Sequence, residues 1–210
     1  MKKTAFAFVM VACIYMPASA ITGLGIGIHA GQTSGYDCET FDQAVQAISD
    51  SLEVLLEDYS PDEAPKFDEK LTSIGAHFKV GTLPIVDFIA FVDYAWKKKE
   101  LVSDVDLRVS NLSYGITISK KFGAALLKPY FGAGLGFHKV VYNLESADEL
   151  LLPPLPEDET KQGYHLVGGV ELNFPVFPLS PYAEGRYNII NTSEKSTRYF
   201  LLSLGLTMNF

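Results

Sequence analysis

A two-residue periodicity runs along most of the chain and constrains its fold more than any other feature. The C-terminal residues divide by parity into an apolar and a mostly polar set: Leu202, Leu204, Leu206, Met208 and Phe210 against Ser203, Gly205, Thr207 and Asn209. A period of two is typical of a β-strand that has one apolar face. The chain therefore ends on a strand.

Eight extended segments are predicted, and most of them alternate in this way: residues 21–33, 71–82, 84–96, 105–122, 128–143, 161–175, 180–191 and 197–210. Short connectors at 82–84, 122–127 and 176–180 are interspersed with longer ones at 34–70, 97–104, 144–160 and 192–196. Alternate connectors of an up-and-down barrel lie at the same rim. The pattern predicts an all-β, eight-stranded antiparallel transmembrane barrel with short turns at one rim and longer loops at the other.

The charged residues indicate which face points outward. One glycine-rich face carries all four histidines and five charged residues: Lys79, Asp87, Glu171, Glu184 and Arg186. Eight strands enclose too little volume to bury these groups in a dry core, whereas a lipid-facing apolar stripe leaves them free to pair inside. Parity alone does not exclude the reverse arrangement, so a soluble lipocalin-like carrier of an apolar ligand remains the alternative.

The N-terminus has the features of a secretory signal. Lys2 and Lys3 precede an apolar run that is too short to span a bilayer, and Ala18-Ser19-Ala20 forms a small-x-small cleavage site. Lipid modification of Cys13 is a competing interpretation. Cleavage of residues 1–20 changes the net charge from −8 to −10 and leaves one cysteine, so neither a nucleic-acid partner nor an intrachain disulfide is expected.

Aromatic residues recur at spacings that suit two membrane interfaces. Tyr164 and Phe174 lie ten residues apart on one face, which corresponds to about 25 Å across a tilted barrel. An inner girdle is predicted from Phe122, Phe131, Phe174 and Phe210. An outer girdle is predicted from Tyr94, Trp96, Phe137, Tyr164 and Phe200.

Several motifs resemble a known family. The final residues are similar to the assembly signal of outer-membrane barrels at Ser203, Gly205, Met208 and Phe210, and PYFGAGLGF at 129–137 resembles strand segments of the OmpA/OmpX-type eight-stranded family. The resemblance implies the outer membrane of a Gram-negative bacterium. It also implies contact with outer-membrane lipid, lipopolysaccharide and the assembly machinery. It implies no particular activity, since the family includes structural, adhesive and enzymatic members.

The 34–70 segment is predicted to be an acidic extracellular loop of the 21–210 barrel. Thr40 and Gln43 have the form of a capping box, and apolar residues then recur at three and four, which predicts a helix at about 41–59. The helix either covers its own barrel or binds a surface partner or lipid surface. Between Asp37 and Lys70 the chain has 11 acidic and 2 basic residues but no EF-hand spacing, so calcium binding is not expected.

No catalytic, cofactor or metal site is predicted. The histidines lie on the inward face, and nothing resembles the nucleophile and base that a lipid A-modifying enzyme would need. His138 and His165 are placed symmetrically about the 144–160 connector and could be neighbours, but a third metal ligand is not evident.

Instead, the hairpins predict ion pairs inside the barrel. The turn around Leu83 would set Lys79 opposite Asp87, and the 175–180 turn would set Glu171 opposite Glu184 with Arg186 between them. The expected function is that of a non-enzymatic surface protein that contributes to envelope structure or contacts and is not a general porin. A lipid A-modifying enzyme is a further, less favoured alternative.

Overall fold

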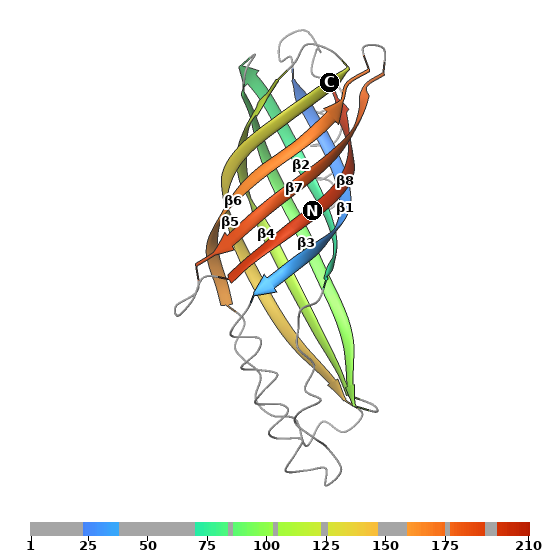
Figure 1. Ribbon diagram of the computed structural model, residues 1–210, viewed down its shortest axis with the longest axis vertical. Coiled ribbons are helices and arrows are strands. Elements are labelled where there is room, and N and C mark those ends of the chain that lie inside the picture. Colours follow the sequence, from blue (N-terminus) through green and yellow to red (C-terminus); the bar gives the residue numbers. More distant parts are fainter. Residues whose placement is uncertain are drawn as a thin grey trace, which may run out of the picture.

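The computed structural model describes residues 23–37, 70–83, 86–102, 105–122, 126–146, 159–174, 177–191 and 197–210, which form one closed barrel (Figure 1). Its strands, in chain order, are β1 (Leu24–Asp37), β2 (Thr72–Leu83), β3 (Val86–Val102), β4 (Val105–Lys121), β5 (Leu127–Ser146), β6 (Glu159–Leu172), β7 (Leu179–Ile190) and β8 (Thr197–Asn209). The predicted eight-stranded antiparallel barrel is confirmed.

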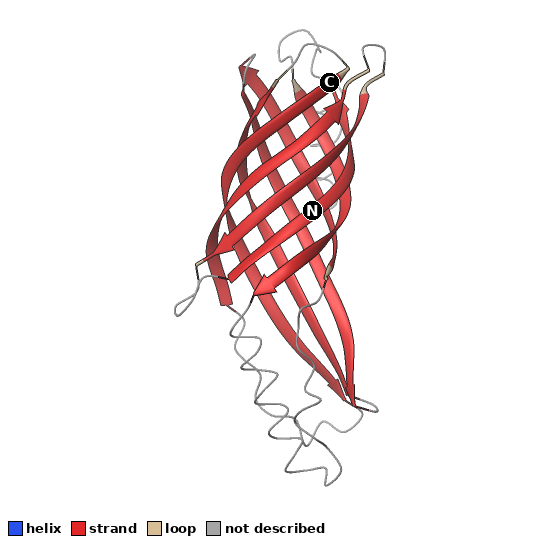
Figure 2. Cartoon of the chain, in the orientation of Figure 1, coloured by secondary structure: helices blue, strands red, loops and turns tan. Residues whose placement is uncertain are grey.

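Each strand pairs with its neighbours in sequence, and β8 closes the barrel by pairing antiparallel with β1 from Gly25↔Asn209 to Asp37↔Arg198. Figure 2 shows strands and short loops throughout the described part of the chain. No helix in that part is long and apolar enough to cross a membrane. The predicted signal segment 1–20 and loop helix 41–59 lie outside the described residues.

Three adjacent strands are longer than the others. β3 and β4 have 17 residues each and β5 has 20, against 12 to 14 in the rest. Pairing of β3 with β2 stops at Trp96, yet β3 and β4 continue together to Val102↔Val105. The three strands extend past the rim at the end away from the C-terminus (Figure 1).

The predicted longer loop at 97–104 is therefore wrong, because a tight hairpin replaces it. The segment contains Lys97, Lys98 and Lys99, and a strand outside the membrane does not need an apolar face.

The outward face is apolar, as parity predicts. Ile28 and Leu204 are 65% and 68% exposed and would lie in lipid. Aromatic pairs stack near both rims: Phe122 with Phe131 at the short-turn end, and Tyr94 with Trp96 and Tyr114 with Phe137 towards the other. These positions agree with the two predicted girdles.

One glycine permits a close approach that matters for the interior. A Cβ atom on Gly75 would overlap both the His29 imidazole and the Asp93 carboxylate. His29 and Asp93 lie on either side of Gly75 in one row of the sheet, on β1 and β3. The missing side chain lets them meet across β2.

Candidate functional site

Four charged side chains form an inner-rim cluster in the half of the barrel nearer the C-terminus: Lys79, Asp87, Lys121 and Glu171. Lys121 Nζ lies 2.7 Å from Glu171 Oε2 and 3.0 Å from Asp87 Oδ2. Lys79 Nζ lies 3.6 Å from the same Glu171 oxygen and donates to Asn209 Oδ1 at 2.6 Å. Two lysines balance two carboxylates, so this cluster is electrically neutral.

A central cluster lies next to it and consists of His29, Asp93, Glu184 and Arg186. The Arg186 guanidinium donates to Asp93 Oδ2 at 2.6 Å through Nη1 and to Glu184 Oε1 at 2.8 Å through Nη2. It also stacks over the Phe91 ring at 4.2 Å. His29 Nε2 lies 2.6 Å from Asp93 Oδ1. Arg186 and Asp93 are only 5% and 3% exposed, so these charges are held by one another and not by bulk water.

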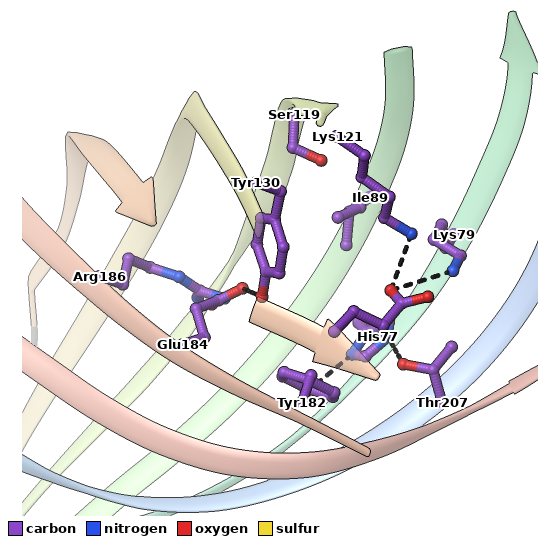
Figure 3. Close-up of a pocket in the computed structure, with 11 residues that line it drawn as sticks. His77, Lys79, Ile89, Ser119, Lys121, Tyr130, Tyr182, Glu184, Arg186 and Thr207 are labelled. Atoms are coloured by element: carbon purple, nitrogen blue, oxygen red, sulfur yellow. Dashed lines mark hydrogen bonds and ion pairs between the residues drawn. The ribbon is translucent and has the colours of Figure 1, made fainter. Parts of the chain in front are cut away.

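Tyrosines and a second histidine connect these groups. Tyr130 Oη donates to Glu184 at 2.8 Å, while Tyr182 Oη lies 3.0 Å from His29 Nδ1 and 3.3 Å from His77 Nδ1. An interior cavity of about 30 Å³ lies among residues of both clusters (Figure 3). This volume holds about two water molecules.

The outer end of the interior is built differently. Four buried apolar residues on inward-facing positions form what we term the outer seal: Leu71, Val109, Ile190 and Leu201. Leu71 is fully buried and anchored to β1, because Thr33 N–H donates to the Leu71 carbonyl at 2.8 Å and Leu71 N–H donates to Thr33 Oγ1 at 3.0 Å. These two bonds continue the β1–β2 ladder by one residue beyond Gln32↔Thr72.

The structure places all five predicted lumen residues in the interior, but with different partners. Lys79 lies opposite Ile89 on the sheet, and its ion pair is with Glu171 rather than Asp87. The predicted opposition of Lys79 and Asp87 is wrong, because Leu83 pairs with Val86 and the hairpin is therefore centred beyond Leu83.

The second predicted pairing is also shifted by two residues. Glu171 lies opposite Tyr182, and Glu184 lies opposite Gly169. Arg186 keeps its predicted contact with Glu184, while its second carboxylate is Asp93 and not Glu171. A register shift of two preserves the inward face and changes every partner.

Sequence reasoning missed three members of the two clusters. Asp93 has the same parity as the inward residue Asp87, but no hairpin sets it opposite a cation. Lys121 lies at the very end of β4, where facing is hard to assign. His29 was treated as one of several lumen histidines, and only the Gly75 gap shows that it reaches Asp93.

The other histidines do not form a metal centre. His138 lies opposite Lys161, and His165 lies opposite Gly134. The prediction that the two histidines are placed symmetrically across the hairpin is therefore wrong, because the register of the two strands differs from the one assumed. His165 Nε2 contacts Thr117 Oγ1 at 2.7 Å. Among the described residues, no group of three or more histidine, cysteine or acidic residues could hold a metal ion.

The residues of the predicted assembly signal lie in the C-terminal half of β8 and directly after it. Ser203 points inward, Met208 and Phe210 are exposed on the lipid side, and Phe210 N–H donates to the Leu24 carbonyl at 2.8 Å. Phe210 therefore secures the seam between β8 and β1. Its role in assembly stays a prediction.

No protein-family model matches the sequence, and no curated protein matches it significantly. The fold is similar to that of Neisserial surface protein A (NspA), with a TM-score of 0.55 and 18% identity over 90% of this chain and 97% of that one. It is also similar to Ail, the attachment invasion locus protein of Yersinia pestis, solved in complex with the heparin analogue sucrose octasulfate. That TM-score is 0.52, with 12% identity over 90% of this chain and 99% of Ail.

Proposed function

We propose that this chain, which has the fold of the OmpA/OmpX-type eight-stranded barrels of the Gram-negative outer membrane, is a non-conducting and non-enzymatic surface protein. The observation that carries the proposal is the filled interior. The inner-rim and central clusters occupy one half, and the outer seal closes the other. Neither solutes nor a lumenal substrate have room to enter.

The same observation argues against the carrier alternative. An apolar ligand needs a large apolar pocket, whereas this interior contains a polar cavity of about 30 Å³. The apolar surface of the barrel is on its outside, where Ile28 and Leu204 are exposed.

Single-channel recording in planar bilayers tests the proposal. The unmodified protein should give no steady conductance. Because each half is filled independently, Leu71→Ser with Leu201→Ser should leave it closed, and so should Lys121→Ser with Glu171→Ser. Only the variant with all four substitutions should conduct. Steady openings of the unmodified barrel would contradict the proposal.

A surface role needs an outward-facing contact, and the extended strands offer one. Lys98 on β3 and Arg108 on β4 lie directly opposite each other on the outward face, beyond the outer aromatic girdle. The next opposed positions on this face are held by Glu100 and Asp106, so a cationic pair lies beside an acidic one in the ladder, and the cationic pair is the part that suits an anionic partner. Because this level lies beyond the outer aromatic girdle, we place the phosphates of lipopolysaccharide here. The similarity in fold to Ail, solved with a sulfated sugar, supports an anionic glycan as the partner.

Lipopolysaccharide binding tests this part of the proposal. Lys98→Gln with Arg108→Gln should reduce both the lipopolysaccharide that co-purifies and the thermal stabilisation that added lipopolysaccharide gives. Lys120→Gln is the matched control, because Lys120 is also outward but lies at the short-turn rim beside Phe122. An equal loss in the control, or no loss in the double variant, would reject lipopolysaccharide as the ligand.

Enzymatic modification of lipid A is not favoured by the geometry. All four histidines of the chain lie on inward-facing positions, and three of them are buried, so none meets the lipid as a general base. Mass spectrometry of lipid A from cells that overproduce the protein should therefore show an unchanged spectrum. A new lipid A species, absent with an empty vector, would overturn the proposal.

A further inference from the structure

A continuous row of hydrogen-bonding groups crosses the interior from β3 to β8. It consists of Asp93, His29, Tyr182, His77 and Thr207, and we term it the relay row. The successive contacts are Asp93 Oδ1 to His29 Nε2 at 2.6 Å, His29 Nδ1 to Tyr182 Oη at 3.0 Å, Tyr182 Oη to His77 Nδ1 at 3.3 Å, and His77 Nε2 to Thr207 Oγ1 at 3.1 Å. Every polar atom of both imidazoles is used.

Counting donors restricts where the hydrogens lie. Tyr182 has one hydroxyl hydrogen and faces an Nδ1 atom on each side. His29 must carry a hydrogen on Nε2, because a bare nitrogen could not lie 2.6 Å from the Asp93 carboxylate. With both histidines neutral, Tyr182 donates to His29, and His77 must donate from Nδ1 and accept from Thr207. All four bonds then run in one direction, from Thr207 to Asp93.

One added proton reverses part of the row without moving a heavy atom. When His29 carries hydrogens on both nitrogens, its Nδ1 donates to Tyr182, Tyr182 donates to His77 Nδ1, and His77 Nε2 donates to Thr207. The row again has four hydrogen bonds. Two satisfied states exist, and they differ by one proton and by the tautomer of His77.

Charge balance favours storage of that proton on His29. The inner-rim cluster has two cations and two carboxylates, whereas Arg186 of the central cluster faces both Asp93 and Glu184. The central cluster therefore lacks one positive charge when His29 is neutral. An imidazolium at His29 removes this deficit, and buried charges need such compensation.

The charged groups around His29 and His77 also favour His29 as the site of the added proton. His29 faces Asp93 from β3, His77 from β2 and Tyr182 from β7. His77 interacts electrostatically with Lys79 on its own strand and with both Glu184 and Arg186 from β7, and two of these three charges are cations. A positive charge is thus better placed at His29 than at His77.

The cavity borders Tyr182, His77 and Thr207 of the row. His77 and Thr207 line that cavity together with Lys79 and Lys121 (Figure 3), whereas His29 does not. A proton that arrives from water therefore meets His77 Nε2 before it can meet His29.

We propose that the relay row passes a proton from the cavity to His29 and stores it there. The entering proton forms an N–H bond at His77 Nε2, and the Nδ1–H bond of His77 breaks as its proton moves to Tyr182 Oη. The original Tyr182 O–H bond breaks as that proton moves to His29 Nδ1. One proton is gained, every intermediate group ends neutral, and the positive charge rests beside Asp93. The chain would thus hold an exchangeable proton in its interior, a property separate from its surface contacts.

Nuclear magnetic resonance of the full-length protein in lipid nanodiscs, with ¹⁵N-labelled histidine, tests this directly. Long-range ¹H–¹⁵N correlation spectra distinguish the Nδ1–H tautomer, the Nε2–H tautomer and the imidazolium. As the pH is lowered, His29 should become an imidazolium while His77 changes from Nδ1–H to Nε2–H with the same midpoint, and His77 should stay neutral. A His77 tautomer that does not change while His29 titrates would overturn the proposal, as would the absence of any titration at either histidine.

Tyr182→Phe removes the hydrogen-bonded link between His29 and His77 and should abolish the shared midpoint. Tyr130→Phe is the matched control, because Tyr130 is also a buried lumenal tyrosine but donates to Glu184 outside the row. It should keep the shared midpoint. Persistence of the shared midpoint in Tyr182→Phe would overturn the relay. If that variant fails to assemble, the unmodified protein still decides through the coupled change of His77.

Discussion

The two ends of the barrel interior are filled by opposite means. Towards the C-terminus, buried lysine, arginine and acidic side chains neutralise one another around a small cavity. Towards the long loops, Leu71, Val109, Ile190 and Leu201 are buried together with uncharged polar residues such as Asn111 and Thr197, and Leu201 lies opposite Arg186, where the two halves meet.

The difference shows what each kind of filling requires. An apolar seal needs only shape, so its members can be exchanged for others of similar volume at modest cost. A buried charge needs a particular partner at a particular distance, and removal of that partner leaves an uncompensated ion. The inner half should therefore be intolerant of single substitutions, while the outer half should respond in proportion to the volume that is lost.

Arg186→Ala is expected to have the largest effect on this contrast. It leaves Asp93 and Glu184 buried without their shared cation and should lower the free energy of unfolding by about 3–5 kcal/mol. Urea titration of the refolded protein, followed by the shift in gel mobility, measures it. Arg198→Ala is the control, because the Arg198 side chain on β8 is exposed, and it should lower the free energy of unfolding by less than about 1 kcal/mol. Equal losses would mean that the central cluster is not desolvated.

Leu201→Ala measures the outer half. Removal of a fully packed leucine should cost about 2–4 kcal/mol, since both transfer energy and cavity energy are lost. Ile89→Ala is matched to it, because Ile89 borders the existing cavity and is only half-buried. We expect about 1 kcal/mol there from the same urea titration. A larger loss at Ile89 than at Leu201 would reverse the assignment of the two halves.

Substitutions in the inner-rim cluster should lower the free energy of unfolding by less, and a second substitution there should partly reverse the loss. Glu171→Met leaves Lys79 and Lys121 without their common carboxylate and should lower the free energy of unfolding by about 2 kcal/mol. This loss is smaller than that for a fully buried pair, because Lys121 is partly exposed to solvent. Lys121→Met added to Glu171→Met should restore about 1 kcal/mol, because charge balance returns. Additive losses in the double variant would show that the two residues do not interact.

Phe210→Ala should have the smallest effect on stability, below about 1 kcal/mol, since its side chain is exposed on the lipid side at the inner rim. Its predicted effect is on assembly. The amount of folded protein in the outer membrane should fall sharply while the urea midpoint of the folded fraction is nearly unchanged. Phe174→Ala, another exposed aromatic residue at this rim, should assemble normally. Normal membrane levels of the Phe210 variant would contradict the assembly role.

The sequence predicts facing far better than it predicts contacts. Alternation has a period of two, so Glu171, Glu184 and Arg186 are assigned inward whatever the register. Their partners depend on register, and that is set by local irregularities such as the shift between Val80 and Leu83. An error of two residues leaves the pattern of faces intact, which is why alternation could not detect it.

Contacts across the barrel are harder still to predict. Asp93 on β3 meets Arg186 on β7, and no hairpin or shared ladder relates these two strands. The tilt of the strands brings such residues to one level, and tilt is a property of the closed barrel and not of any segment. The extension of β3 to Val102 was missed for another reason, since a strand in water carries lysines as readily as a loop does.

The gap at Gly75 has a consequence for how the sequence can diverge. Because a single Cβ atom there would occupy the space that His29 and Asp93 share, the three positions cannot vary independently. A lineage that acquires alanine at position 75 must lose the histidine or the acid, and once either is lost, nothing selects for return of the glycine. Among related chains, glycine at this position should therefore accompany the histidine–aspartate pair, and larger residues should accompany its loss. A glycine that looks like an inconspicuous strand residue would then be the best marker of the charged interior.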